Sequence, residues 1–268
     1  SGGGHGHPDR LNVLFAEGAT RWLDDLGTGS YVDPSLHWYR SSLAHNAPLA
    51  GGRSQSRVDG SLLAWDERGG FGSVSAEVVG IAPGVRVERT LVVARDYFVD
   101  ELRWEAAPAS RLELPLHFDG ALRGAQWSSG ERLDGSNGLE DGFRFAVECQ
   151  AAVVPPMTVL ELEAHRAGRT ARAFICSESE SRWFRAIAPG QPSDVPRPFF
   201  VARCEGSAGV IRTVWCWSPR VEAVAFLQRG LSSIEVTLAG ETHVHRRAAD
   251  RWRVHVETGG VRNAVDLA

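Results

Sequence analysis

Short runs in which apolar and polar residues alternate follow one another along most of the chain, separated by glycine, proline and charged residues. The clearest is 85–91, Val-Arg-Val-Glu-Arg-Thr-Leu, after which 94–96 interrupt the pattern and a second run starts at Tyr97. Alternation with a period of two is typical of β-strands, and two such runs around a short turn predict a hairpin.

The same pattern predicts strands throughout the chain, whereas glycine and proline interrupt most windows that could hold a helix. Residues 11–19 are ambiguous, and Val13-Leu14-Phe15 favours a strand there. The predicted strands are 62–65, 72–79, 85–93, 97–105, 112–118, 143–147, 157–163, 170–176, 209–217, 221–227, 234–238 and 252–256. Short strands at regular spacing predict an all-β fold, a large antiparallel two-sheet β-sandwich with little helix.

Hydrophobic residues make up 43% of the sequence and are spread evenly along it, so we expect residues 1–268 to form a single domain. The proline-rich stretch 188–198 is the one candidate linker, and we expect it to be a surface loop. Apolar runs fall short of the roughly 20 residues that span a bilayer, and no signal peptide is recognisable. Because the sequence starts without methionine inside a motif, we expect a mature, cleaved or truncated product.

The charge balance argues against nucleic acid as a partner. Asp and Glu number 33 against 29 basic residues, and the basic residues are scattered. All of them are arginine, which suits bidentate recognition of carboxylate or sulfate, although a GC-rich genome would give the same bias. The cysteines Cys149, Cys176, Cys204 and Cys216 form no CxxC pair, and we expect small buried hydrophobes, with one disulfide as an alternative.

Chemically active side chains crowd near the start of the chain. His5 and His7 are two residues apart, so they project from the same face if this segment is a strand. Asp25, His37 and His45 follow within the same short region, and imidazole with carboxylate is the ligand set of a zinc or similar divalent site. The alternative is that a glycine-rich end merely carries solvated histidines.

Four blocks in this region, taken in order, resemble the heparinase II/III-like family of polysaccharide lyases. They are 4–12, Gly-His-Gly-His-Pro-Asp-Arg-Leu-Asn; 25–31, Asp-Leu-Gly-Thr-Gly-Ser-Tyr; 38–46, Trp-Tyr-Arg-Ser-Ser-Leu-Ala-His-Asn; and 52–55, Gly-Arg-Ser-Gln. Residues 84–90 and 114–118 also resemble strands of the family. After Asn46 the chain departs from the pattern, because 47–52 replace the usual Thr and Val-Asp-Gly turn.

The resemblance implies roles for individual residues. His5 matches a histidine in the catalytic cleft of such lyases, while His7, Asp25 and His45 match the ligands of a structural zinc ion. His37 is then expected at the rim or in packing. The implied fold is the β-sandwich of the lyase supersandwich type.

The implied reaction is β-elimination at a uronic acid of an acidic poly- or oligosaccharide, such as alginate or a glycosaminoglycan. It needs a group that neutralises the carboxylate, a base for the C5 proton and an acid for the departing O4. Arg40 suits the first role, and His5, Tyr31 and Tyr39 are the catalytic candidates, with packing or sugar stacking as the alternative for each tyrosine. Trp38 and Asn46 complete the predicted substrate site.

Related lyases place an α/α toroid before the sandwich, and this sequence shows none. The chain is therefore expected to be the C-terminal part of a larger lyase, inactive without the toroid region in cis or as a separate chain, and periplasmic or secreted. The alternative is a non-catalytic carbohydrate-binding or structural β-sandwich with a stabilising metal. Outside the signature, His117 is expected between the sheets or at a rim, and His243 and His245 on an exposed strand face.

Overall fold

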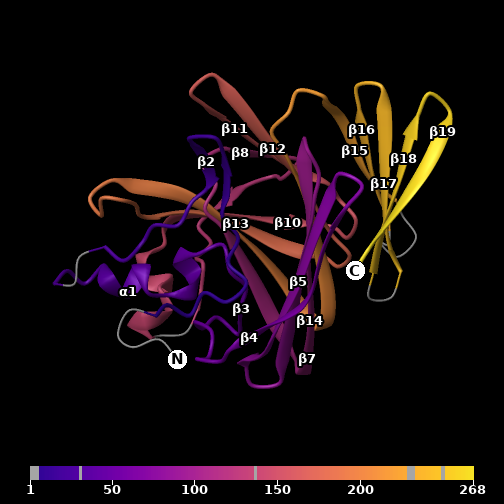
Figure 1. The fold of residues 1–268 in the computed structure, drawn as a ribbon. Helices are drawn as coiled ribbons and strands as arrows, with labels where there is room; N and C mark the ends of the chain where they lie inside the picture. The colour runs from indigo at the N-terminus through magenta and orange to yellow at the C-terminus, as the bar shows by residue number, and fades with distance from the viewer. Residues whose placement is uncertain (1–5, 30–31, 136–137, 228–232, 249–250) are drawn as a thin grey trace.

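The computed structural model describes residues 6–29, 32–135, 138–227, 233–248 and 251–268 (Figure 1). Antiparallel strands make up most of these residues, which confirms the predicted all-β class. Within the described ranges, helical structure is confined to single turns: α1 (Leu36–Tyr39) and the 3₁₀ turns η1 (Ser42–Ala44), η2 (Leu139–Asp141) and η3 (Phe143–Phe145).

A 12-stranded sheet organises the molecule around two long neighbouring strands, β7 and β14. The first part of β14 pairs with β13 and with the end of β7, and its second part pairs with β12 and with the start of β7. From edge to edge the main order is β4-β5-β6-β7-β14-β12-β11-β8. Its strands are β3 (Leu49–Ala50), β4 (Gly60–Arg68), β5 (Phe71–Ala82), β6 (Val85–Val93), β7 (Tyr97–Leu116), β8 (Ala121–Arg123), β9 (Ser128–Ser129), β10 (Val147–Val154), β11 (Leu160–Arg166), β12 (Arg169–Ser177), β13 (Ser181–Pro189) and β14 (Pro196–Cys216).

A second sheet of five strands packs on one face of this sheet (Figure 1). It runs β15 (Val221–Leu227), β16 (Ser233–Leu238), β17 (Glu241–Ala248), β18 (Arg251–Thr258) and β19 (Val261–Leu267) in chain order. The large sheet has a hydrophobic core on each face, because successive side chains of a strand point to opposite faces. Val99 packs in the core shared with the five-stranded sheet, and its neighbour Phe98 packs in the main core on the other face.

Residues 6–59, which we call the N-terminal segment, cover the surface beside β13 and β14. Apart from the short strands β1 (Phe15–Glu17), β2 (Thr20–Leu23) and β3, and the turns α1 and η1, the segment is irregular. Trp38 and Leu43 from these turns share a buried cluster with Phe184 of β13 and Phe199 of β14. Burial of this apolar face fixes the segment on the sheet.

Where the prediction rested on strict alternation, the bounds of the predicted strands agree with those in the structure. The runs 85–93 and 221–227 are β6 and β15, and β6 forms the expected hairpin with β7. The prediction of a strand from Phe143 was wrong, because Gly142 has a positive φ of 82° and starts a 3₁₀ turn. The proline-rich stretch 188–198 joins β13 to β14 and includes the ends of both strands. All four cysteines are free thiols, so the alternative of a disulfide is also wrong.

The pair His243 and His245 lies between the two sheets, so the predicted exposed strand face is wrong. Both imidazoles bond the Tyr97 hydroxyl, at 2.7 Å from His243 Nδ1 and 2.6 Å from His245 Nε2. His245 is completely buried, and burial lowers its pKa to about 3. His243 and His245 are two residues apart on β17, so both side chains project from the same face of the strand, toward Tyr97.

Candidate functional site

His45 lies at the centre of the candidate site, at the end of η1, where it is 1% exposed. Its Nδ1 is 3.0 Å from Asp25 Oδ2, and its Nε2 is 3.2 Å from His7 Nδ1 and 3.1 Å from the Tyr39 carbonyl oxygen. The structure therefore brings together the three residues predicted as metal ligands.

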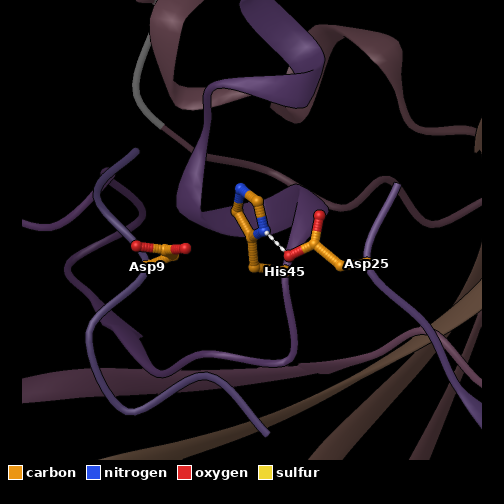
Figure 2. A group of neighbouring side chains, drawn as sticks. All are labelled: Asp9, Asp25 and His45. Atoms are coloured by element: carbon orange, nitrogen blue, oxygen red, sulfur yellow. Dashed lines mark hydrogen bonds and ion pairs between the residues drawn. The ribbon is translucent and has the colours of Figure 1, made fainter. Parts of the chain in front are cut away.

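Asp9 joins this group, which the sequence analysis did not predict. Figure 2 shows Asp9 and Asp25 on opposite sides of the His45 ring. One ligand atom from each of Asp9, Asp25 and His45 lies within 4.8 Å of the others. The sequence feature that could have identified Asp9 is its position two residues after His7, within the first signature block. Imidazole nitrogen and carboxylate oxygen together form a donor set that fits a zinc ion.

The Asp25 carboxylate is held in place by several donors. Asn12 Nδ2 donates to Oδ2 at 3.1 Å, and the Gly27 amide donates to Oδ1 at 2.8 Å. Burial alone would raise the pKa of Asp25, but the hydrogen bond and charge of His45 and the Gly27 amide outweigh it and lower the pKa to about 2. The carboxylate is thus ionised and preorganised opposite His45.

Asn46 connects the segment internally instead of facing a ligand. Its side chain donates to the Asp24 carbonyl at 3.0 Å and accepts the His117 backbone amide at 2.7 Å, and its own amide donates to Asn12 Oδ1 at 3.0 Å. Asn46 is completely buried. The predicted substrate contact of Asn46 is therefore corrected to a positioning role.

Arg89 of β6 joins the large sheet to the site. Its guanidinium forms a two-pronged ion pair with Asp100 of β7, at 2.8 and 2.6 Å, and both side chains are 3% exposed. The same group donates at 2.7 Å to the carbonyl oxygens of Leu11 and Asn46. The irregular segment is therefore fixed to the sheet by its main chain immediately beside Asn12 and His45.

Trp38 and Tyr39 are buried, which corrects their predicted substrate and catalytic roles. The Trp38 indole donates to the Pro189 carbonyl at 2.9 Å, and the Tyr39 hydroxyl donates to the Gly190 carbonyl. Burial raises the pKa of Tyr39. With their rings and polar atoms directed at the β13–β14 connection, both residues hold α1 on the sheet. His5 and Tyr31 lie outside the described residues, so their predicted roles stay predictions.

His117 is buried beneath the site, between the large sheet and the N-terminal segment and not between the two sheets or at a rim. Its ring stacks on Phe199 with centroids 5.2 Å apart, and its Nε2 is 2.9 Å from the Leu43 carbonyl oxygen. Burial lowers the pKa of His117 to about 4, so the ring is neutral at pH 7. It supports η1 from below.

Two pockets flank residues 6–8. One of about 410 Å³ lies toward α1 and has Gly6, Pro8, His37, Arg40, Arg57 and Glu140 in its lining. The other, of about 360 Å³, includes His7, Arg10 and Arg57. Arg40 is half-buried and His37 is exposed, which agrees with the rim position expected for His37. We call the first of these the cationic pocket.

The electrostatics of His7 reflect its position between these features. Burial lowers the pKa of its imidazole, the charges of His45 and Arg40 lower it further, and Asp9 and Asp25 oppose them. The His7 ring lies 5.2 Å from the His45 ring, centroid to centroid. A neutral imidazole at this position is available to accept a proton or to bind a metal ion.

In the described part of the chain, no helix is long and apolar enough to cross a membrane. Residues 1–182 match the family described as "Heparinase II/III-like, C-terminal". An alginate lyase of Stenotrophomonas maltophilia (strain K279a) is 26% identical over 148 residues, which cover 45% of this chain and 20% of that protein.

Solved structures support the fold relationship. A heparinase III gene product superposes with a TM-score of 0.66 at 11% identity, over 99% of this chain and 37% of that one. The heparan sulfate lyase HepC from Pedobacter heparinus, in a mutant form, gives a TM-score of 0.59 at 11% identity, over 98% of this chain and 37% of that one. The chain thus spans about a fifth of the curated relative and little more than a third of these structures. It belongs to the heparinase II/III-like C-terminal family.

Proposed function

We propose that the chain is the C-terminal part of a polysaccharide lyase that cleaves an acidic poly- or oligosaccharide by β-elimination at a uronic acid. The observation that carries this proposal is the position of the cationic pocket directly beside residues 6–8, next in the chain to His5 and adjacent to the His7, Asp25 and His45 cluster. Family membership and the alginate and heparan sulfate lyases among the similar proteins support the same reaction class.

A few side chains carry out the steps of the proposed elimination. The half-buried guanidinium of Arg40 neutralises the uronate carboxylate, which makes the C5 proton more acidic. His5 accepts that proton or bonds the carboxylate, and Tyr31 or a tyrosine outside this chain protonates the departing O4. The products are a shortened saccharide and a fragment with a C4–C5 double bond.

A zinc ion fits the cluster as a structural element. Ligand atoms of Asp9, Asp25 and His45 lie within 4.8 Å of one another, and His7 Nδ1 lies 3.2 Å from His45 Nε2, so these residues offer the nitrogen and oxygen donors that zinc takes up. When bound, zinc would cross-link the irregular loops beside the cleft. A His7→Ala variant whose zinc content equals that of the wild-type protein would remove this assignment.

The remaining wall of the cleft is proposed to come from the region that precedes this one in the longer relatives, in cis or as a separate chain. An extracellular polysaccharide as substrate would place the enzyme in the periplasm or outside the cell. We expect the 268-residue chain to be inactive alone and active when joined to such a region.

The test is the ultraviolet absorbance of an unsaturated uronide, released from alginate or heparan sulfate oligosaccharides by the joined protein. Products without this chromophore would rule out elimination. His5→Ala should abolish turnover while the melting temperature stays unchanged, and His165→Ala on β11, an exposed histidine, is the matched control.

The second candidate is a carbohydrate-binding or structural sandwich without catalysis. The burial of Trp38 and Tyr39 favours it, since two predicted functional aromatics serve packing. Loss of the fold in His5→Ala, without any turnover in the wild-type protein, would support this candidate.

A further inference from the structure

Arg57 lies between the two pockets, a position that the sequence signature does not mark. It lines both the cationic pocket and the pocket containing His7 and Arg10. A ligand in either pocket can therefore reach the Arg57 side chain. Arg57 is exposed, whereas Arg40, on the cationic pocket, is half-buried.

The backbone that carries Arg57 is held firmly. The Ser56 amide donates to the Ile81 carbonyl at 2.7 Å. Gln55 is buried, and its side-chain amide bonds the Arg10 main chain at 2.9 Å and the Pro48 carbonyl at 2.6 Å. Arg57 thus extends from a fixed backbone position, so a ligand that orders its side chain does not also have to order the backbone.

The arginines at and beside the cationic pocket differ in whether a carboxylate pairs with them. Arg10, the neighbouring cation, donates to the Val58 carbonyl at 3.1 Å and lies 3.6 Å from Asp59. Among the residues that the structure describes, no carboxylate pairs with Arg40 or Arg57. Two guanidinium groups with open donor sets therefore face one pocket, and each presents the planar fork that matches carboxylate or sulfate oxygens.

Two acidic residues also line the cationic pocket. Glu140 is exposed there, and Asp141 accepts the Ser54 amide at 2.6 Å. A carboxylate in the pocket accepts hydrogen bonds from hydroxyl groups. The pocket thus offers cationic partners for an anionic group and acceptors for hydroxyl groups.

We propose that Arg57, together with Arg40, binds the anionic group of a saccharide residue and makes Arg57 a determinant of selection for charged over neutral sugars. This inference rests on the proposed function for the identity of the ligand as a saccharide. The shared chemistry is an anionic oxygen group, either a uronate carboxylate or a sugar sulfate.

The test is calorimetric binding of three probes to the 268-residue chain: an alginate oligosaccharide with carboxylates alone, a sulfated heparan oligosaccharide and a neutral oligosaccharide of equal length. Arg57→Ala should weaken binding of an anionic probe by about tenfold or more, and should also reduce the dependence of binding on salt. Arg57→Lys should recover part of the loss, because it restores charge without the fork. Whichever anionic probe shows the larger loss identifies the group.

Arg262→Ala is the matched control, since Arg262 is an exposed arginine on β19 at the opposite end of the molecule (Figure 1). It should bind as the wild-type protein does. Equal binding by Arg57→Ala and wild type, equal binding of neutral and anionic probes, or no binding of either anionic probe would each overturn the inference. Because the readout is binding, loss of the Arg57 effect is distinguishable from failure of the proposed elimination, which is measured separately by the unsaturated product.

Discussion

Replacing Arg89 with methionine would remove a charge that is buried between β6 and the N-terminal segment. Asp100 would be left as an uncompensated carboxylate with 3% exposure, and the carbonyls of Leu11 and Asn46 would lose donors at 2.7 Å. Breaking a buried ion pair by removing one partner costs about 3–5 kcal/mol. Since whole domains are stable by about 5–15 kcal/mol, Arg89→Met should remove a large share of the free energy of unfolding.

The measurement is urea unfolding followed by tryptophan fluorescence. The double variant Arg89→Met/Asp100→Leu is the informative control, because replacing both charges with apolar groups is often close to neutral. It should regain most of the lost stability. The proposed zinc binding should be weakened in both variants, since the segment lacks its anchor in each. A loss below about 1 kcal/mol in the single variant, or no recovery in the double one, would refute this account.

Three further predictions concern packing and titration. Because the pKa of His117 is about 4 when folded and 6.5 when unfolded, the contribution of His117 to stability is fully present above pH 6.5 and falls by about 3 kcal/mol as the pH drops to 4; His117→Gln should lack this part of the urea-midpoint profile, and equal profiles would contradict this. Gly142→Ala should cost about 2–4 kcal/mol, since its φ is 82° and the new Cβ would lie 2.2 Å from Ser41 Oγ, whereas Gly168→Ala, at φ 73° with open space, should show the backbone cost alone. Tyr97→Phe leaves His243 and His245 without their shared partner and should cost about 1–3 kcal/mol by urea unfolding; a change below about 0.5 kcal/mol would show that the histidines find other partners.

Fold class was predictable because alternation is a local property. The run 85–93 repeats with period two, and the structure has a strand over the same residues. The strand Ser181–Pro189 was missed because Trp183 and Phe184 are adjacent and both buried, which breaks the alternation. Where a strand is covered on both faces, periodicity no longer distinguishes it.

The site was predictable only in part. His7, Asp25 and His45 could be grouped from the signature, and they do lie together. The position of Asp9 beside them depends on the path of an irregular loop, which no local pattern encodes. Trp38 was misassigned because an aromatic residue in a signature looks the same in sequence whether its ring faces a ligand or the core.

Arg89 has a consequence for how the site can vary among related proteins. Its guanidinium bonds the main-chain oxygens of Leu11 and Asn46, and every amino acid has such an oxygen. The anchor is therefore indifferent to the side chain at Leu11, which can change without loosening the attachment. With this attachment, side chains along the N-terminal segment can be exchanged while the segment stays in register with the sheet. Substitution of Arg89 itself lacks that freedom, because Asp100 depends on it.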